Sequence, residues 1–143
     1  MTQKIYSKNL FNKNKFEYTI KHMNILESLE DYLERILMLK EKLTNVRSID
    51  IAQDMGYSKP SVSIAMKKLK EKELIEIDSK GYITLTNEGE AIASKTYEKH
   101  KLIFNLLVSI GVSETTARDD ACKIEHQLSE ETVSKLKEFA NKK

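Results

Sequence analysis

The sequence lacks several features that would place it in common classes of protein. Its 143 residues include one cysteine, which excludes a disulfide within the chain. No apolar run approaches the roughly 20 residues that a membrane span requires, and the first residues show no signal-peptide pattern. The four glycines form no phosphate-binding loop of the Walker or dinucleotide type. We therefore expect a soluble cytoplasmic protein without a membrane partner.

An excess of charge of either sign is also absent. Lysine and arginine total 24, aspartate and glutamate total 22, and the net charge is +2. Affinity for nucleic acid would therefore have to come from local clusters of lysine. A hydrophobic content of 40% is sufficient for the core of one domain, or of a small domain with a helical extension.

A helix-turn-helix pattern is present between residues 48 and 72. Ser48 can cap a first helix that has apolar residues at 51, 52 and 55, and Gly56 can end it. Ser58 can cap a second helix with Pro60 in its first turn. The apolar stripe of this second helix consists of Val62, Ala65, Met66 and Leu69. Two such helices also occur inside ordinary all-α domains, so the pattern alone leaves that alternative open.

Residues 74–86 indicate a β-hairpin, because apolar and polar residues alternate on both sides of a turn at 79–81. Its apolar positions are Ile75, Ile77, Ile83 and Leu85. A helix-turn-helix followed directly by a hairpin is a winged helix and predicts DNA binding. In such folds the N-terminal residues of the second helix read base edges and nearby lysines contact phosphates. The residues expected to contact DNA are Lys59, Pro60, Ser61, Ser63, Lys67 and Lys80.

Candidate metal ligands occur on two predicted helices that flank this region. The helix over about 28–42 carries Asp31 and Glu34, whose spacing of three places both carboxylates on one side. The structural alternative is an acidic residue favoured near a helix N-terminus and a solvated charge. A long helix that Thr86 can cap carries His100 near its middle, and a lone histidine there can equally be a surface or hydrogen-bonded residue.

A third predicted helix, which Ser113 can cap, carries Cys122, Glu125 and His126. Their i, i+3, i+4 spacing places a thiol, a carboxylate and an imidazole on one face. The alternatives are a small buried hydrophobe for the cysteine and a solvated pair for the other two. The buried stripe expected beside them consists of Ala117, Ala121, Ile124 and Leu128. Ser129 can cap a last helix.

The span from about residue 28 to residue 136 resembles the DtxR/MntR family of metal-dependent transcriptional repressors. The matching motifs are the segments Leu29–Glu34, Lys59–Ser63, Glu98–His100 and Asp120–His126, which follow the family's order. The resemblance implies a mainly α-helical protein with a small β-hairpin. It implies a winged helix-turn-helix DNA-binding domain over residues 25–86 and a helical metal-binding and dimerisation domain over 87–143. Residues 1–24 are expected to form a flexible extension.

The resemblance also implies one metal site, to which the separate candidates would all contribute. Its ligands would be Asp31, Glu34, His100, Cys122, Glu125 and His126. Asp31 and Glu34 match the manganese-sensing members of the family, whereas Cys122 matches the iron-sensing members. We therefore expect Mn²⁺ or Fe²⁺, with Co²⁺, Zn²⁺ or Cd²⁺ as substitutes.

The same resemblance implies a homodimer that binds a double-stranded DNA operator and represses genes of metal homeostasis, such as those for metal uptake. We expect the chain to lack the SH3-like C-terminal domain of the larger iron-sensing members.

Two other functions remain open from the residues alone. One is a winged-helix repressor that senses a small organic ligand without metal. The other is a small metalloenzyme, which would need an open coordination position beside a substrate pocket with a general base. Because no further group is placed for that chemistry, we expect neither enzymatic activity nor a small-molecule substrate.

Overall fold

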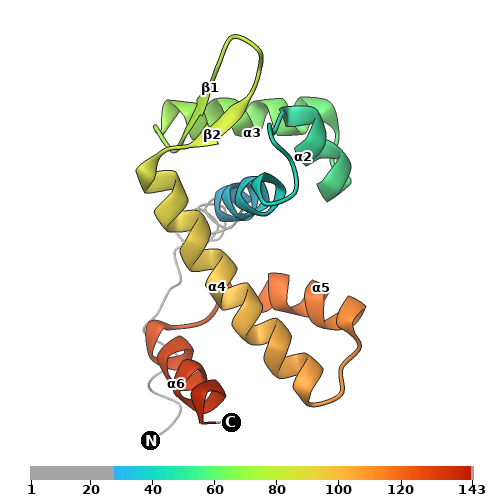
Figure 1. Ribbon diagram of the computed structural model, residues 1–143, viewed down its shortest axis with the longest axis vertical. Coiled ribbons are helices and arrows are strands. Elements are labelled where there is room, and N and C mark those ends of the chain that lie inside the picture. The colour runs from blue at the N-terminus through green and yellow to red at the C-terminus, as the bar shows by residue number, and fades with distance from the viewer. Residues whose placement is uncertain (1–27, 143) are drawn as a thin grey trace, which may run out of the picture.

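The computed structural model of the protein describes residues 28–142, and the expected extension at 1–24 lies outside them. The described part is mainly helical, with one two-stranded antiparallel sheet (Figure 1). The chain is helical over residues 28–40, drawn in blue. The labelled elements are α2 (Ser48–Met55), α3 (Lys59–Glu71), β1 (Ile75–Ile77), β2 (Ile83–Leu85), α4 (Asn87–Ser109), α5 (Glu114–Ile124) and α6 (Glu130–Asn141). The expected fold class is confirmed.

The helix-turn-helix is formed by α2 and α3. Gly56 ends α2 at a positive φ of 68°, which glycine adopts without strain. The Ser58 hydroxyl accepts a hydrogen bond from the Ser61 N–H and caps α3. All four residues of the predicted stripe of α3 are buried. Ser48 was expected as the cap of α2 but is its first residue, because the Asp50 carboxylate accepts from the Arg47 N–H at 2.8 Å and fixes the start one residue earlier.

The wing is the hairpin of β1 and β2, in which Ile75 pairs with Leu85. Ile75 and Ile83 point inward and are buried, as the alternation predicts. The Asp78 carboxylate accepts hydrogen bonds from the N–H groups of Lys80 and Tyr82 and orders the turn. The wing therefore packs on the core by one face and presents its turn to solvent.

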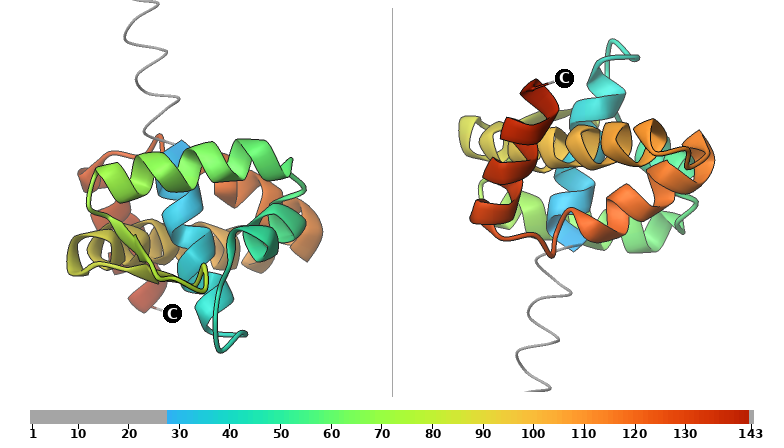
Figure 2. Two further views of the ribbon diagram at one scale, coloured as in Figure 1. Left: turned by 90° about the horizontal axis from the view of Figure 1, so that it is seen from above. Right: turned by 90° about the horizontal axis from the view of Figure 1, so that it is seen from below.

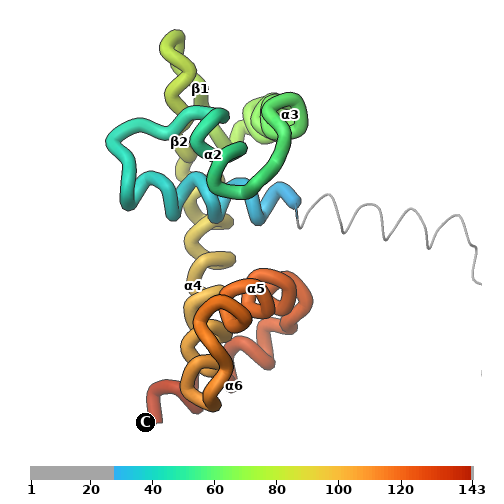
Figure 3. Tube along the Cα trace, turned by 90° about the vertical axis from the view of Figure 1, so that its right-hand side faces the viewer, coloured from blue at the N-terminus to red at the C-terminus, as the bar shows by residue number. Residues whose placement is uncertain are grey.

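The helix over 28–40 forms the centre of the core. Leu33 and Ile36 are fully buried beneath α2 and α3, and the same helix lies between the helix-turn-helix and α5 (Figure 3). It ends at residue 40, two residues before the predicted end, where a turn bonds Lys42 N–H to the Leu39 carbonyl. A single helix therefore contacts both halves of the molecule.

Helix α4 runs from the wing to the C-terminal helices (Figures 1 and 2). Thr86 accepts from the Gly89 N–H and donates its hydroxyl to the Glu73 carbonyl. Gly89 is buried against Leu74 so closely that an added Cβ would lie 1.9 Å from the Leu74 carbonyl oxygen. This first turn fixes the direction in which α4 leaves the wing.

The C-terminal helices α5 and α6 both pack on α4. Ala117 and Ala121 of the predicted stripe are fully buried, but Ile124 is 38% exposed and Leu128 is only half-buried. The expectation for Ile124 was wrong because α5 ends there and the chain turns away. Within residues 28–142, no helix is long and apolar enough to span a membrane.

Candidate metal centre and DNA-facing surface

The structure brings the six predicted metal ligands together from three elements. The helix over 28–40 supplies Asp31 and Glu34, α4 supplies His100, and the end of α5 with the turn after it supplies the other three. The donor atoms form two groups, and within each group all atoms lie within 4.8 Å of one another. The first group is Asp31, Cys122 and Glu125, and the second is Glu34, His100 and Glu125. Glu125 belongs to both groups.

Glu125 lies at the centre of this cluster and its side chain is fully buried. Its Oε2 lies 2.9 Å from His100 Nδ1, and its Oε1 lies 3.4 Å from His126 Nε2. The Glu34 side chain is 5% exposed and its Oε1 lies 3.9 Å from the same His100 nitrogen. The solvated alternatives for Glu34 and Glu125 are therefore wrong.

Two carboxylate oxygens in the cluster have no hydrogen-bond partner among residues 28–142. They are Glu34 Oε1 and Glu125 Oε1, and both are buried. A buried polar atom without a partner is costly, by about 1–3 kcal/mol or more for a charged group. Hard carboxylate oxygens without a donor are what a divalent cation requires, so the residues present fit a metal site.

Burial shifts the pKa values of the Glu34 and Glu125 carboxyl groups upward. Burial, together with the neighbouring Glu125, raises the pKa of Glu34 to about 8, and burial raises the pKa of Glu125 to about 7. Burial likewise raises the pKa of the Cys122 thiol to about 12 and lowers that of His100. The cluster without a cation is therefore partly protonated at neutral pH.

Both ring nitrogens of His126 lie close to carboxylates of two consecutive residues of the helix over 28–40. Its Nε2 lies 2.6 Å from Asp31 Oδ1, and its Nδ1 lies 2.8 Å from Glu30 Oε2. Although burial lowers the pKa of His126, these hydrogen bonds raise it to about 10. Glu30 was not among the predicted site residues, because only the fold brings it to a histidine 96 positions away.

The predicted DNA-contacting residues lie on two elements of the winged helix. Five are on α3 and Lys80 is at the turn of the wing, and all six are exposed. Ile64 lies among them on α3 with 58% of its surface exposed. Ile64 was not among the predicted site residues. Its position outside the apolar stripe of α3 is the signal in the sequence that this apolar side chain faces outward.

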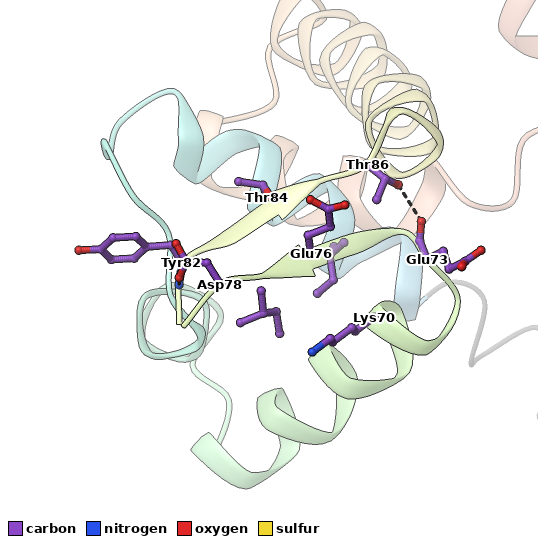
Figure 4. A pocket seen from close by; sticks show the side chains of 9 residues that line it. Lys70, Glu73, Glu76, Asp78, Tyr82, Thr84 and Thr86 are labelled. Atoms are coloured by element: carbon purple, nitrogen blue, oxygen red, sulfur yellow. Dashed lines mark hydrogen bonds between the residues drawn. The ribbon is translucent and has the colours of Figure 1, made fainter. Parts of the chain in front are cut away.

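A hollow of about 530 Å³ separates α3 from the wing (Figure 4). Lys70 enters it from α3, and Glu76 and Asp78 line it from the wing. Carboxylates on the wing side disfavour a phosphate in this hollow. The predicted DNA-contacting residues, which all lie outside this hollow, remain the candidates for the DNA-facing surface.

Fold and cluster together define a winged-helix DNA-binding protein with a group of metal-donor side chains at the junction of its two halves. Residues 24–83 match the N-terminal DNA-binding domain of iron-dependent repressors, and residues 86–142 match the metal-binding and dimerisation domain of the same repressors. The chain belongs to this family of transcriptional regulators.

Individual relatives agree with that assignment. The chain is 37% identical over 116 residues to the transcriptional regulator MntR of Escherichia coli O6:H1, covering 81% of this chain and 75% of that protein. The structure of the manganese regulator SloR superposes with a TM-score of 0.70 at 33% identity, and covers 79% of this chain. ScaR with bound Zn²⁺ gives a TM-score of 0.64 at 34% identity over 79% of this chain. The chain spans 53% of the length of both of these structures.

Proposed function

We propose that this chain is a metal-dependent transcriptional repressor that senses Mn²⁺ or Fe²⁺ and controls genes of metal homeostasis, such as those for metal uptake. The observation that carries the proposal is the convergence of six metal-donor side chains beneath a winged helix, with two buried carboxylate oxygens that accept no hydrogen bond from residues 28–142. The proposed ligands are Asp31, Glu34, His100, Cys122, Glu125 and His126.

The ligands lie on both sides of a junction. Asp31 and Glu34 belong to the helix that packs under α2 and α3, whereas the others belong to α4 and α5 or follow α5. Without a cation, the carboxylates of Glu34 and Glu125 repel each other across this junction unless one is protonated. A bound divalent cation supplies the positive charge that offsets this repulsion. The ligands then hold the two halves in one arrangement.

That arrangement matters because the regulator is proposed to act as a homodimer on a double-stranded operator. Two copies of α3 must reach half-sites about 34 Å apart, or a multiple of this distance. Ser61, Ser63 and Pro60 would face base edges, whereas Lys59, Lys67 and Lys80 would face phosphates. A conformer with the correct separation binds DNA more tightly, and by linkage DNA tightens metal binding equally.

The donor set also bears on which ion is sensed. Three carboxylates and two imidazoles suit Mn²⁺ or Fe²⁺, and the thiol of Cys122 adds affinity for softer ions such as Co²⁺, Zn²⁺ or Cd²⁺. The alternative of a repressor that senses an organic ligand is not favoured, because the C-terminal match is described as a metal-binding domain.

The test measures DNA affinity with Mn²⁺ and with chelator, using duplexes selected by the protein from a random pool. We expect Mn²⁺ to raise the affinity of the wild type by about 5–150-fold, the usual range of coupling between two sites. A Glu125→Ala, His126→Ala double variant should lose this increase and keep weak nonspecific binding. Glu138→Ala, an exposed residue of α6 paired with Lys135, is the matched control and should respond normally.

The possible outcomes distinguish a failure of the proposed function from a failure of the ligand assignment. A wild type whose DNA affinity ignores both Mn²⁺ and Fe²⁺ would contradict metal-dependent repression. Normal chelator-sensitive binding by the double variant would contradict the ligand assignment alone.

A further inference from the structure

Glu30 makes a contact that the proposed ligand set does not explain. Its Oε2 lies 2.8 Å from His126 Nδ1, while Asp31 Oδ1 lies 2.6 Å from Nε2 of the same ring. The His126 side chain is 5% exposed, so this buried imidazole is fixed at both nitrogens by two consecutive residues. The Glu30 side chain is 41% exposed and reaches the ring from the solvent side.

The two carboxylates are not equivalent, because the two ring nitrogens point in different directions. Nε2 faces Asp31 and also lies 3.4 Å from Glu125 Oε1, so it points into the donor cluster. Nδ1 points out of the cluster toward Glu30. A carboxylate on Nδ1 cannot share an ion with Nε2, and Glu30 is absent from both groups of converging donor atoms.

We infer that Glu30 is a positioning residue that holds His126 with its Nδ1–H donated to the carboxylate and its Nε2 directed into the metal site. This inference rests on the proposed function. A ligating histidine commonly donates its other N–H to a carboxylate, which fixes the tautomer and the ring orientation and makes the ligating nitrogen more basic.

The position of Glu30 adds a second effect. It lies on the helix over 28–40, whereas His126 follows α5, so the hydrogen bond joins the two sides of the junction. Glu30 therefore aligns His126 with Asp31 before an ion arrives. Because the ring is already oriented, less conformational freedom is lost when the ion binds.

The test uses the full chain and measures the dissociation constant for Mn²⁺ by competition with a chelating dye. Glu30→Ala should weaken binding by about 10–100-fold, the range for losing a carboxylate behind a ligating histidine. Glu30→Gln should lose less, because its amide oxygen still accepts from Nδ1–H. Glu138→Gln removes the same charge from α6 and should bind as the wild type does. Circular dichroism in chelator should be unchanged in all variants.

A second measurement reports which nitrogen of the His126 ring carries the proton and which binds the metal. Nitrogen NMR of the Zn²⁺-loaded wild type should show His126 protonated at Nδ1 and bound through Nε2, and Glu30→Ala should lose this uniform state. Equal losses in the alanine and glutamine variants would indicate a purely electrostatic role and overturn the inference, as would wild-type affinity in Glu30→Ala.

Comparison with His126→Ala separates the two levels of the proposal. If His126→Ala loses Mn²⁺ and Glu30→Ala does not, only the positioning role fails. If the wild type binds neither Mn²⁺ nor Zn²⁺, the proposed function itself fails.

Discussion

Arg35 and Asp54 connect the helix that carries Asp31 and Glu34 to the first helix of the helix-turn-helix. The Arg35 guanidinium donates to the Asp54 carboxylate at 2.7 Å, and the two side chains are 29% and 35% exposed. Neither residue belongs to the groups of converging donor atoms, and the pair joins the helix over 28–40 to α2. It is therefore placed to transmit a movement of one helix to the other.

We expect Asp54→Asn to weaken metal-stimulated DNA binding without changing the affinity for Mn²⁺. A partly exposed ion pair contributes about 0.2–1 kcal/mol, so the loss of stimulation should be at most about fivefold. Titrations with Mn²⁺ and with DNA, made on the same preparation, measure both quantities. The reversed pair, Arg35→Asp with Asp54→Arg, should restore the coupling. A changed Mn²⁺ affinity in Asp54→Asn would show that the residue acts on the metal site instead.

The DNA-facing surface predicts a specific dependence on salt. Replacing Lys67 or Lys80 with alanine should weaken binding to all sequences and make the salt slope shallower by about 0.9, because one phosphate contact is lost. Lys135→Ala on α6 is the matched control and should leave the slope unaltered. Unchanged slopes in both lysine variants would place the DNA elsewhere.

Replacing Ile64, which lies on the same helix as Lys67, with alanine should change the sequence preference but not the salt dependence. It removes an exposed apolar side chain and no charge, so the salt slope should stay constant while sequence preference changes at one base pair. Selection from a random duplex pool measures that preference. An identical preferred sequence would show that Ile64 does not contact the bases.

The sequence predicts the secondary structure of the fold better than it predicts the contacts within the site. The stripe of α3 and the alternation of the wing each report a local period, and both are confirmed. The meeting of Asp31 with His126, 95 positions away, has no local signal, and the expectation that they share a site came from the family resemblance. The contact of Glu30 with His126 could not be predicted, because adjacent residues on a helix point about 100° apart. Only the packing of α5 shows that Glu30 and Asp31 both reach the His126 ring.

Stability without metal should depend on pH in a direction set by the donor cluster. The pKa values of Glu34, Glu125 and His126 are raised to about 8, about 7 and about 10. Between the ordinary and the raised values, the folded protein holds more protons than the unfolded chain. The free energy of unfolding therefore falls as pH rises. His100, whose pKa is lowered from 6.5, has the opposite effect only below that value.

We thus expect the free energy of unfolding in chelator to decrease from about pH 6.5 to pH 8. Urea denaturation at several pH values measures it. Glu34→Gln, which cannot ionise, should flatten the dependence. A free energy that rises over this range would contradict the ionisation states assigned to the cluster.

The identity of the activating metal should depend on Cys122. Its thiol has a pKa of about 12 because it is buried, so it is protonated until an ion displaces the proton. Softer ions gain most from a thiolate, whereas Mn²⁺ prefers oxygen. Cys122→Glu should therefore reduce the response to Fe²⁺, Co²⁺ or Zn²⁺ more than the response to Mn²⁺. Anaerobic DNA-binding titrations with each metal measure the ranking, since Fe²⁺ and a free thiol oxidise in air. An unchanged ranking would show that Cys122 does not bind the ion.

The attachment of α4 to the wing makes this helix a lever. Its 23 residues correspond to about 34 Å of rigid rod. Thr86 bonds both to the Glu73 carbonyl and to the Gly89 N–H, and Gly89 leaves no gap against Leu74, so the base of the rod cannot slide on the wing. A tilt of about 5° at one end moves the other end by roughly 3 Å over such a length. His100 lies near the middle of the rod, so a small rotation of α4 about the donor cluster would displace the wing by more than it displaces His100.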